Sequence, residues 1–204
     1  MGTRRYQQRA RAESAEQTRR RILDTVIEKL RHAPMEPISV EDVASAAGVA
    51  RSTVYAIFGS RAGLFEAVGS EFYDRAGYER LLDAVRHPDA REHLRGGIRA
   101  ASAMLAADRD VVRALFSIAE HDEHGVGRIV RGTESERARG MARLARRLEE
   151  QGELRPDLSV ADAEHILWVL TSFESFDLLY RGRDLDADAA AELLVATAER
   201  AVCT

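Results

Sequence analysis

Six consecutive residues, RSTVYA at positions 51–56, place a cation, hydroxyl groups and a methyl group on one short segment. A guanidinium binds phosphate, hydroxyl groups reach phosphates or base edges, and short side chains let a helix approach the major groove closely. The residues expected to act in this way are Arg51, Ser52, Thr53, Tyr55 and Ala56. Their types and spacing predict contacts with double-stranded DNA.

The remaining side chains of this segment predict how it is held. Val54, Ile57 and Phe58 stand at the helical spacing i, i+3 and i+4, so they form the inward face of a helix over residues 51–58. A helix of this length is unstable alone, so it must pack against neighbouring helices. Gly48 permits the positive φ of a tight turn, which predicts a helix-turn-helix.

Two further residues open helices next to this segment. Ser39 begins the helix before the turn, and Arg61 begins the helix after the recognition segment. Backbone N–H groups at a helix start favour an anion, so we expect both residues to contact phosphates. From geometry alone an alternative stays open, a three-helix core with a solvated outer face in which Tyr55 is a partly buried packing residue.

Charge is distributed unevenly along the chain. The 204 residues carry a net charge of −4. Through Phe65 there are eleven basic and seven acidic side chains, a net charge of +4, so the remainder carries −8. A basic segment attached to an acidic body suggests a nucleic-acid-binding module joined to a second domain.

Helical spacing and cap residues recur along the rest of the chain, without strand-like alternation. The sequence therefore predicts an all-α protein. Its parts are a flexible basic arm at residues 1–13, a helix-turn-helix domain at 14–76 and a helical domain at 77–204.

Cap signals predict several helix starts. A capping box at Ser14–Gln17 indicates the start of the first long helix. Ser159 is expected to cap a helix that continues through Tyr180, and Asp186 to cap the last helix.

Residues 39–65, SVEDVASAAGVARSTVYAIFGSRAGLF, closely resemble the DNA-binding domain of TetR-family transcriptional regulators. The resemblance covers about residues 16–76 and includes the Ala46-Ala47-Gly48-Val49 turn, Thr53-Val54-Tyr55, Phe58 and the stretch from Ser60 to Leu64. It implies DNA contacts by Thr53 and Tyr55 and a phosphate contact by Arg61. Two residues depart from the family pattern, since Ala50 replaces the usual Ser cap and Ala56 a common histidine.

The last two helices predict a homodimer. Apolar residues face two sides of the helix that ends at Tyr180, and small residues on the last helix allow close helix approach. A two-fold four-helix interface would bury the second side, and TetR-like proteins use their last two helices in this way. A monomeric core is the alternative.

The resemblance also implies a ligand cavity among the middle helices, filled by a largely apolar small-molecule effector. The candidate lining residues are Phe72, Met104, Leu105, Phe116, Met141 and Trp168. The function implied is a dimeric regulator, most simply a repressor released from a palindromic operator by its effector. A helical small-molecule-binding protein without DNA-binding activity is the alternative.

Other functional classes lack the residues they need. No catalytic constellation, nucleophile elbow or phosphate-binding glycine loop is found, so neither an enzyme nor a cofactor is expected. Glu120-His121-Asp122-Glu123-His124 offers metal-ligand types, but its place beside Gly125 favours a solvated helix end. A single cysteine, Cys203, and the lack of a long apolar run predict a cytoplasmic protein with no membrane partner.

Overall fold

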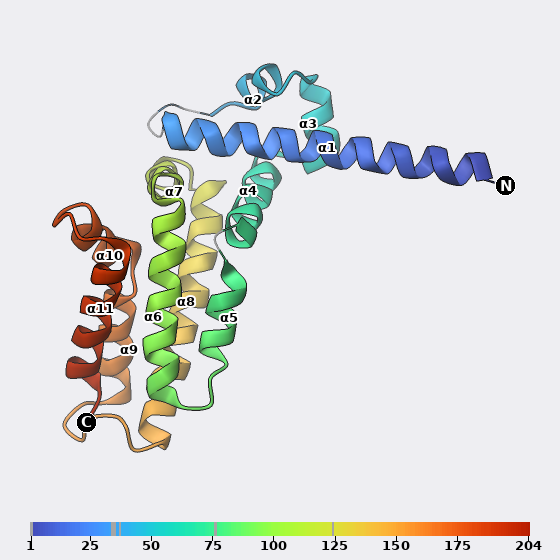
Figure 1. Ribbon diagram of the computed structural model, residues 1–204. Helices are drawn as coiled ribbons and strands as arrows, with labels where there is room; N and C mark the ends of the chain where they lie inside the picture. The colour runs from blue at the N-terminus through green and yellow to red at the C-terminus, as the bar shows by residue number, and fades with distance from the viewer. Residues whose placement is uncertain (1, 34–35, 37, 76, 124) are drawn as a thin grey trace. The chain divides into compact units, whose positions relative to one another are not determined.

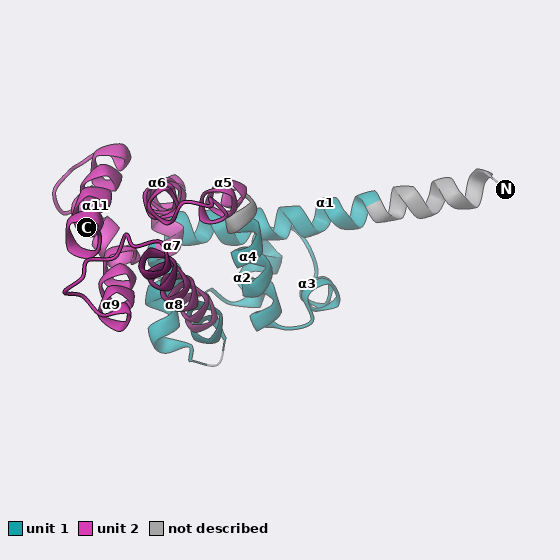
Figure 2. Ribbon diagram, turned by 90° about the horizontal axis from the view of Figure 1, so that it is seen from below, with its two compact units in different colours: residues 1–71, 113–130 teal, residues 72–112, 131–204 magenta. Residues whose placement is uncertain are grey.

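The computed structural model describes the backbone of residues 2–204 other than 34–35, 37, 76 and 124, and their side chains other than those of residues 2–12, 73 and 74. Over this part of the chain, eleven helices form and no strand is present (Figure 1). The predicted all-α class is therefore confirmed. The chain divides into two compact units, unit 1 with residues 1–71 and 113–130 and unit 2 with residues 72–112 and 131–204 (Figure 2).

The helices are numbered in chain order. They are α1 Gly2–His32, α2 Val40–Ala46, α3 Arg51–Phe58, α4 Arg61–Arg75, α5 Tyr78–Val85, α6 Ala90–Ala107, α7 Arg109–His121, α8 Val126–Glu150, α9 Val160–Leu170, α10 Phe173–Tyr180 and α11 Ala187–Val202. Residues 113–130 group with the N-terminal helices. The domain boundaries at residues 13 and 76 stay a prediction.

The first helix differs from its predicted start. α1 begins at Gly2, and Ser14 lies in its interior, where the Ser14 carbonyl accepts a hydrogen bond from the Thr18 hydroxyl at 2.9 Å. The predicted capping box at Ser14–Gln17 is therefore wrong. Residues 2–13 are rich in Arg, Gln and Ala, which favour helix, so the helix does not need to begin at a cap. The mobility of the predicted basic arm stays a prediction.

Unit 1 has its core on one face of α1. The residues of α1 that are buried there are Ile22, Leu23, Val26, Ile27 and Leu30. α2 packs against α1 and also against α3. α4 adds the buried side chains of Leu64, Phe65 and Val68. The apolar stripe of the first helix therefore forms the base on which the short helices rest.

Unit 2 has its core among α6, α8, α9, α10 and α11. Large buried members are Leu94, Leu148, Leu167 and Phe176. α6 packs against both α5 and α11 (Figure 1). Gly96 permits the close approach of α5, since a Cβ there would lie 3.2 Å from the Cβ of Ala84.

The predicted single helix through Tyr180 is two helices. α9 ends at Leu170 and α10 begins at Phe173, so this prediction is wrong. Ser172 is the physical reason: its Oγ accepts a hydrogen bond from the N–H of Ser175 at 3.1 Å and caps a new helix. The predicted caps at Ser159 and Asp186 are confirmed.

Candidate nucleic-acid interface

The recognition helix α3 is held to unit 1 by its apolar face. Val54 is 1% exposed, and Ile57 and Phe58 are half-buried. The guanidinium of Arg19 on α1 lies over the Phe58 ring, 5.9 Å from its centre. The predicted inward face is confirmed, with Val54 as its one fully buried member.

The turn before α3 has the geometry of a tight connection. Gly48 has φ +64°, a left-handed conformation that favours glycine. The N–H of Val49 donates to the carbonyl of Ala44 at 2.9 Å. Gly48 therefore ends the preceding helix and allows α3 to begin at Arg51, as the sequence predicts.

Ser39 caps α2 on the surface of unit 1. Its Oγ accepts from the N–H of Asp42 at 3.1 Å and donates to the Asp42 carboxylate at 2.5 Å. This hydrogen bond from Ser39 is the main reason why the pKa of Asp42 lies below its usual value. The predicted start of α2 is confirmed, and a phosphate contact by Ser39 stays a prediction.

The outward face of α3 is free of other parts of unit 1. Arg51, Ser52, Tyr55 and Ala56 are exposed, and Thr53 is half-buried. Tyr55 is 37% exposed, so it lies on the surface and not in the core. Arg51, Ser52, Tyr55 and Ala56 therefore share the exposed side of α3, whereas Ser39 and Arg61 lie at the starts of α2 and α4.

The start of α3 suits an anion. Ala50 provides no side-chain cap, and the first turn contains no acidic residue. The Arg51 guanidinium lies 5.5 Å from the centre of the Tyr55 ring and donates to its hydroxyl at 3.4 Å. This hydrogen bond raises the pKa of Arg51. A helix start with a nearby cation and no acid attracts phosphate.

Arg61 is engaged within unit 1. It donates to the carbonyl of Ile38 at 3.3 Å, forms an ion pair with Asp122, and lies over the Phe65 ring at 4.9 Å. The structure therefore brings Arg61 to the junction between α7 and α8. Its phosphate contact stays a prediction.

Asp122 is the partner that sequence reasoning missed. Its carboxylate also accepts from the N–H of Gly125 at 3.0 Å and of Val126 at 3.3 Å, so it caps α8. Burial raises the pKa of Asp122, but the hydrogen bonds from Arg61 and from these N–H groups outweigh it and hold the pKa below its usual value. The spacing from Asp122 to the helix start was a cap signal in the sequence.

Of the acidic and histidine residues at positions 120–124, Asp122 forms the ion pair with Arg61. Among the residues that the structure describes, no three His, Cys, Asp or Glu side chains lie close enough to hold a metal ion. His124 lies outside the described residues.

A small hollow lies inside unit 2, between α6, the α9–α10 junction and α11. It is lined by Ile98, Ala101, Ser102, Leu105, Leu170, Thr171, Ser172, Phe176 and Leu194. The volume open to the centre of a water molecule is about 10 Å³, room for roughly one water. Ser102 and Ser172 supply hydroxyl groups to an otherwise largely apolar wall.

Of the six predicted lining residues, Leu105 lines this hollow. Phe72 and Met104 are buried elsewhere, and Phe116 and Met141 are half-buried. Trp168 is 42% exposed, with the Arg137 guanidinium 5.0 Å from its ring centre. These residues were expected in the lining because they are apolar and lie in the middle helices. The sequence does not show which side of a helix faces a hollow.

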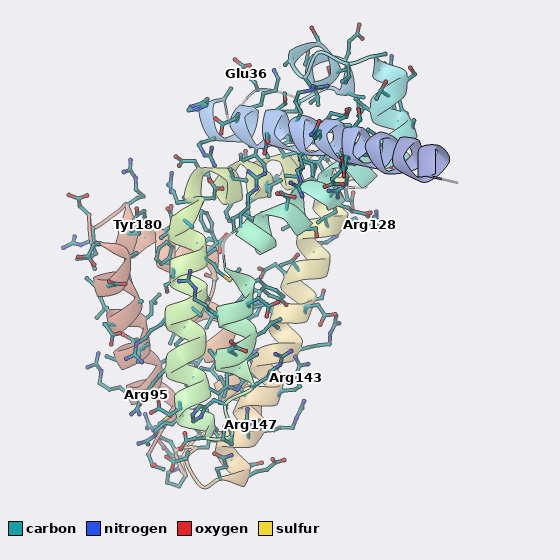
Figure 3. All side chains as sticks on the ribbon, turned by 45° about the vertical axis from the view of Figure 1, so that its right-hand side comes forward. Glu36, Arg95, Arg128, Arg143, Arg147 and Tyr180 are labelled. Carbon is teal, nitrogen blue, oxygen red and sulfur yellow. The ribbon has the colours of Figure 1, made fainter. Side chains whose placement is uncertain are left out.

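Unit 2 also buries charged and titratable groups that the sequence did not reveal. Asp177 on α10 accepts from Arg109 on α7 at 2.6 and 3.1 Å, and Asp177 is 6% exposed. His93 on α6 accepts from Arg147 of α8 at 2.8 Å (Arg147 is labelled in Figure 3). Burial, followed by the positive charges of Arg147 and Arg143 and by His87, lowers the pKa of His93 to about 4.

Apolar side chains are exposed on the last three helices. They are Trp168 and Val169 on α9, Leu178 on α10 and Leu193 on α11, between 42% and 68% exposed. Leu178 is exposed on α10, while Phe173 at the start of the same helix is buried. Within the described part of the chain, no helix has the length and apolar character to cross a membrane.

Comparison with known proteins supports the interpretation of the N-terminal region. Residues 22–68 match the model of the family of bacterial regulatory proteins named tetR, at its N-terminal domain. This match contains α2, the turn and α3, and it confirms the resemblance stated from the sequence. No curated protein matches the chain in sequence.

Solved structures share the fold over nearly the whole chain. NalD of Pseudomonas aeruginosa, the secondary repressor of the MexAB-OprM multidrug efflux pump, is 23% identical, with a TM-score of 0.71 over 93% of this chain and 98% of that one. KstR2 of Mycobacterium tuberculosis, a ketosteroid transcriptional regulator, is 18% identical, with a TM-score of 0.68 over 91% and 95%. A Saccharomonospora viridis protein solved in complex with choline is 17% identical, with a TM-score of 0.69 over 93% and 99%. These TM-scores establish a shared fold, an N-terminal helix-turn-helix followed by a helical body.

Proposed function

We propose that this chain, whose residues 22–68 form an N-terminal domain of the tetR family of bacterial regulatory proteins, is a sequence-specific DNA-binding transcriptional regulator. The observation that carries the proposal is the two-sided character of α3. Val54 anchors the helix from one side, while Arg51, Ser52 and Tyr55 are exposed on the other. Such a face enters a major groove, with Tyr55 and Ser52 at base edges or phosphates and Arg51 at a phosphate.

The regulator acts as a homodimer through its last helices. Two recognition helices must lie roughly 34–36 Å apart to enter successive major grooves, and one chain supplies only one of them. The exposed Trp168, Val169, Leu178 and Leu193 of α9–α11 support this assignment, since association with a second copy would remove these apolar side chains from water. A palindromic operator follows from the two-fold symmetry.

A small-molecule effector releases the dimer from DNA, which makes the protein a repressor. We assign the effector to the hollow between α6, the α9–α10 junction and α11, whose wall is apolar with a few hydroxyl groups and which has room for roughly one water. An effector larger than a water must widen the hollow, so it binds a different conformation of unit 2. The effector binds this widened conformation more tightly than the conformation that binds DNA. The difference between the two affinities sets how much DNA binding is weakened, typically about 1–3 kcal/mol.

Selection of genomic fragments with the purified full chain tests the function. A regulator enriches fragments that contain an inverted repeat, and it shifts these duplexes in a gel. The absence of any enriched fragment would instead favour a helical small-molecule-binding protein without DNA-binding activity.

Matched substitutions then test the face of α3. Tyr55→Phe and Arg51→Ala should each weaken binding to the selected duplex by about 1–3 kcal/mol. Tyr78→Phe on α5 and Arg146→Ala on α8 change equally exposed residues in unit 2 and should leave the affinity unaltered. Equal effects of both pairs would contradict the assignment of α3 as the reading helix.

Sedimentation tests the dimer. The full chain should sediment as a dimer at micromolar concentration, and Leu193→Glu should shift it toward the monomer because the substitution buries a charge in the interface. A monomeric wild-type chain would exclude the paired-helix arrangement.

A further inference from the structure

The start of α4 is tied to the start of α8 by two ion pairs, both within unit 1. Arg61 pairs with Asp122, and Glu66 pairs with Arg128. A Cβ at Gly69 would lie 4.0 Å from Ile129, so the two helix segments also approach closely along their length. The two pairs have opposite polarity, since α4 supplies the cation to one and the anion to the other.

The two pairs differ in how firmly they hold their side chains. Glu66 and Arg128 are 50% and 61% exposed and meet each other at the surface. Asp122 is 25% exposed, and its carboxylate is fixed by the N–H groups of Gly125 and Val126. The Arg61 guanidinium is fixed in turn by the Ile38 carbonyl and the Phe65 ring. Only the Arg61–Asp122 pair therefore holds its cation in one place through several contacts.

Arg61 follows the recognition helix closely in the chain. α3 ends at Phe58, Gly59 caps it with φ +74°, and Ser60 precedes Arg61. In unit 1, Arg51 and Arg61 are the basic residues next to the two ends of α3. The Arg61 side chain is 38% exposed, so part of it is available to an incoming anion.

We propose that Asp122 is an intramolecular competitor for DNA phosphate at Arg61 and thereby sets the DNA affinity of the protein. This inference rests on the proposed DNA-binding function. A carboxylate and a phosphate both accept hydrogen bonds from a guanidinium in a forked arrangement. DNA binding exchanges the Asp122 carboxylate for a backbone phosphate, and the affinity is reduced by the strength of the pair that must break.

The position of Asp122 also makes this competition adjustable. Asp122 caps α8, which runs as one helix from Val126 in unit 1 to Glu150 in unit 2. A shift of α8 that moves its first turn displaces the carboxylate together with the N–H groups that hold it. Such a shift changes the availability of Arg61 without any change in α3.

Asp122→Asn tests the inference, with binding to the selected duplex measured on the full-length protein. Asn keeps an acceptor oxygen for capping α8 but removes the charge that holds Arg61. We expect the variant to bind about twofold to fivefold more tightly than the wild type, the upper part of the range for a partly exposed ion pair. Asp122→Ser provides a second capping residue without charge, and thermal unfolding checks that both variants are folded.

Two further variants separate competition from other causes. Glu66→Gln removes one negative charge and breaks the other α4–α8 pair while Arg61 stays held, so its affinity should change by less than about twofold. In an Arg61→Ala background, Asp122→Asn should have no effect, because the cation for which it competes is absent.

The outcomes distinguish the inference from the function on which it rests. A wild-type chain that selects no duplex overturns the proposed function, and the inference with it. A wild type that binds DNA while Asp122→Asn and Asp122→Ser bind no more tightly overturns the inference alone. A gain in DNA affinity that persists in the Arg61→Ala background also overturns it, since the cause would then be a general change in charge. A gain of the same size in Glu66→Gln overturns it as well, since the cause would then be the charge or a looser α4.

Discussion

Two helices of equal length show how differently a short helix is stabilised in the two units. α3 in unit 1 and α10 in unit 2 each contain eight residues. α10 has a side-chain cap at Ser172 and buries Phe173, Phe176 and Asp177. α3 has no side-chain cap at Ala50 and buries only Val54.

The difference follows from what each helix faces. α10 lies between other helices of its unit, so its polar groups must find partners inside, and Asp177 finds Arg109. α3 leaves exposed the side that we propose contacts DNA, so its exposed side chains and its N-terminus keep few internal contacts. A reading helix is therefore expected to be the less stable of the two, and the following predictions test this comparison.

The largest effect is expected at α10. Asp177→Ala removes the buried carboxylate of this pair and leaves the partly buried Arg109 guanidinium with its surface partner Asp110, so it should lower the free energy of unfolding by about 3 kcal/mol. Urea unfolding followed by circular dichroism measures it. Asp157→Ala is the control, because Asp157 pairs with Arg155 at the surface and should lose less than about 1 kcal/mol. Equal losses of unfolding free energy in the two variants would show that the buried Asp177–Arg109 pair stabilises the protein no more than a surface pair.

The next effect concerns His93, whose pKa is lowered to about 4 from 6.5, first by burial and then by Arg147 and Arg143. Between pH 6.5 and 4 the unfolded chain binds a proton at His93 that the folded chain does not. The free energy of unfolding should therefore fall by roughly 3 kcal/mol across this window through His93 alone. His93→Gln keeps an acceptor for Arg147 but does not titrate, so unfolding measured from pH 7 to 4 should show a shallower loss in the variant. Parallel pH profiles would contradict a neutral buried His93.

A smaller effect is expected at the anchor of α3. Val54→Ala removes its one fully buried side chain and should lower the free energy of unfolding by about 2 kcal/mol. It should also weaken DNA binding, because α3 is formed in a smaller fraction of molecules. Thr133→Ala truncates an exposed side chain of α8 outside the proposed interface and should change stability by less than about 1 kcal/mol. An unchanged stability in Val54→Ala would show that contacts other than this side chain hold α3.

The smallest effects concern the caps. Ala50→Ser should stabilise α3, and Ser172→Ala should destabilise α10, each by about 1 kcal/mol in opposite directions. Hydrogen exchange of the two helices measures both. If the Ala50→Ser variant gives α3 no added protection, the missing cap is unrelated to the low stability of this helix.

Much of the reading domain could be predicted from the sequence because its signals are local. The spacing of Val54, Ile57 and Phe58, the glycine at position 48 and the cap at Ser39 depend on residues a few positions apart, and the structure confirms each. Ser172 illustrates the limit of such signals. A serine inside an apolar helical pattern is compatible with a continuous helix, and the structure uses it to start a new one.

The sequence by itself determined the helical class, the helix-turn-helix and the exposed side of α3, because helical periodicity and glycine conformation are properties of neighbouring residues. Tertiary structure alone decided the partners of charged and apolar groups that lie far apart in the chain. It joined Arg61 to Asp122, Arg109 to Asp177 and His93 to Arg147, and it placed Leu105 in the hollow and Trp168 at the surface. Such pairings depend on how helices pack against one another. The spacing of residues along one helix does not specify which residues of another helix lie beside it.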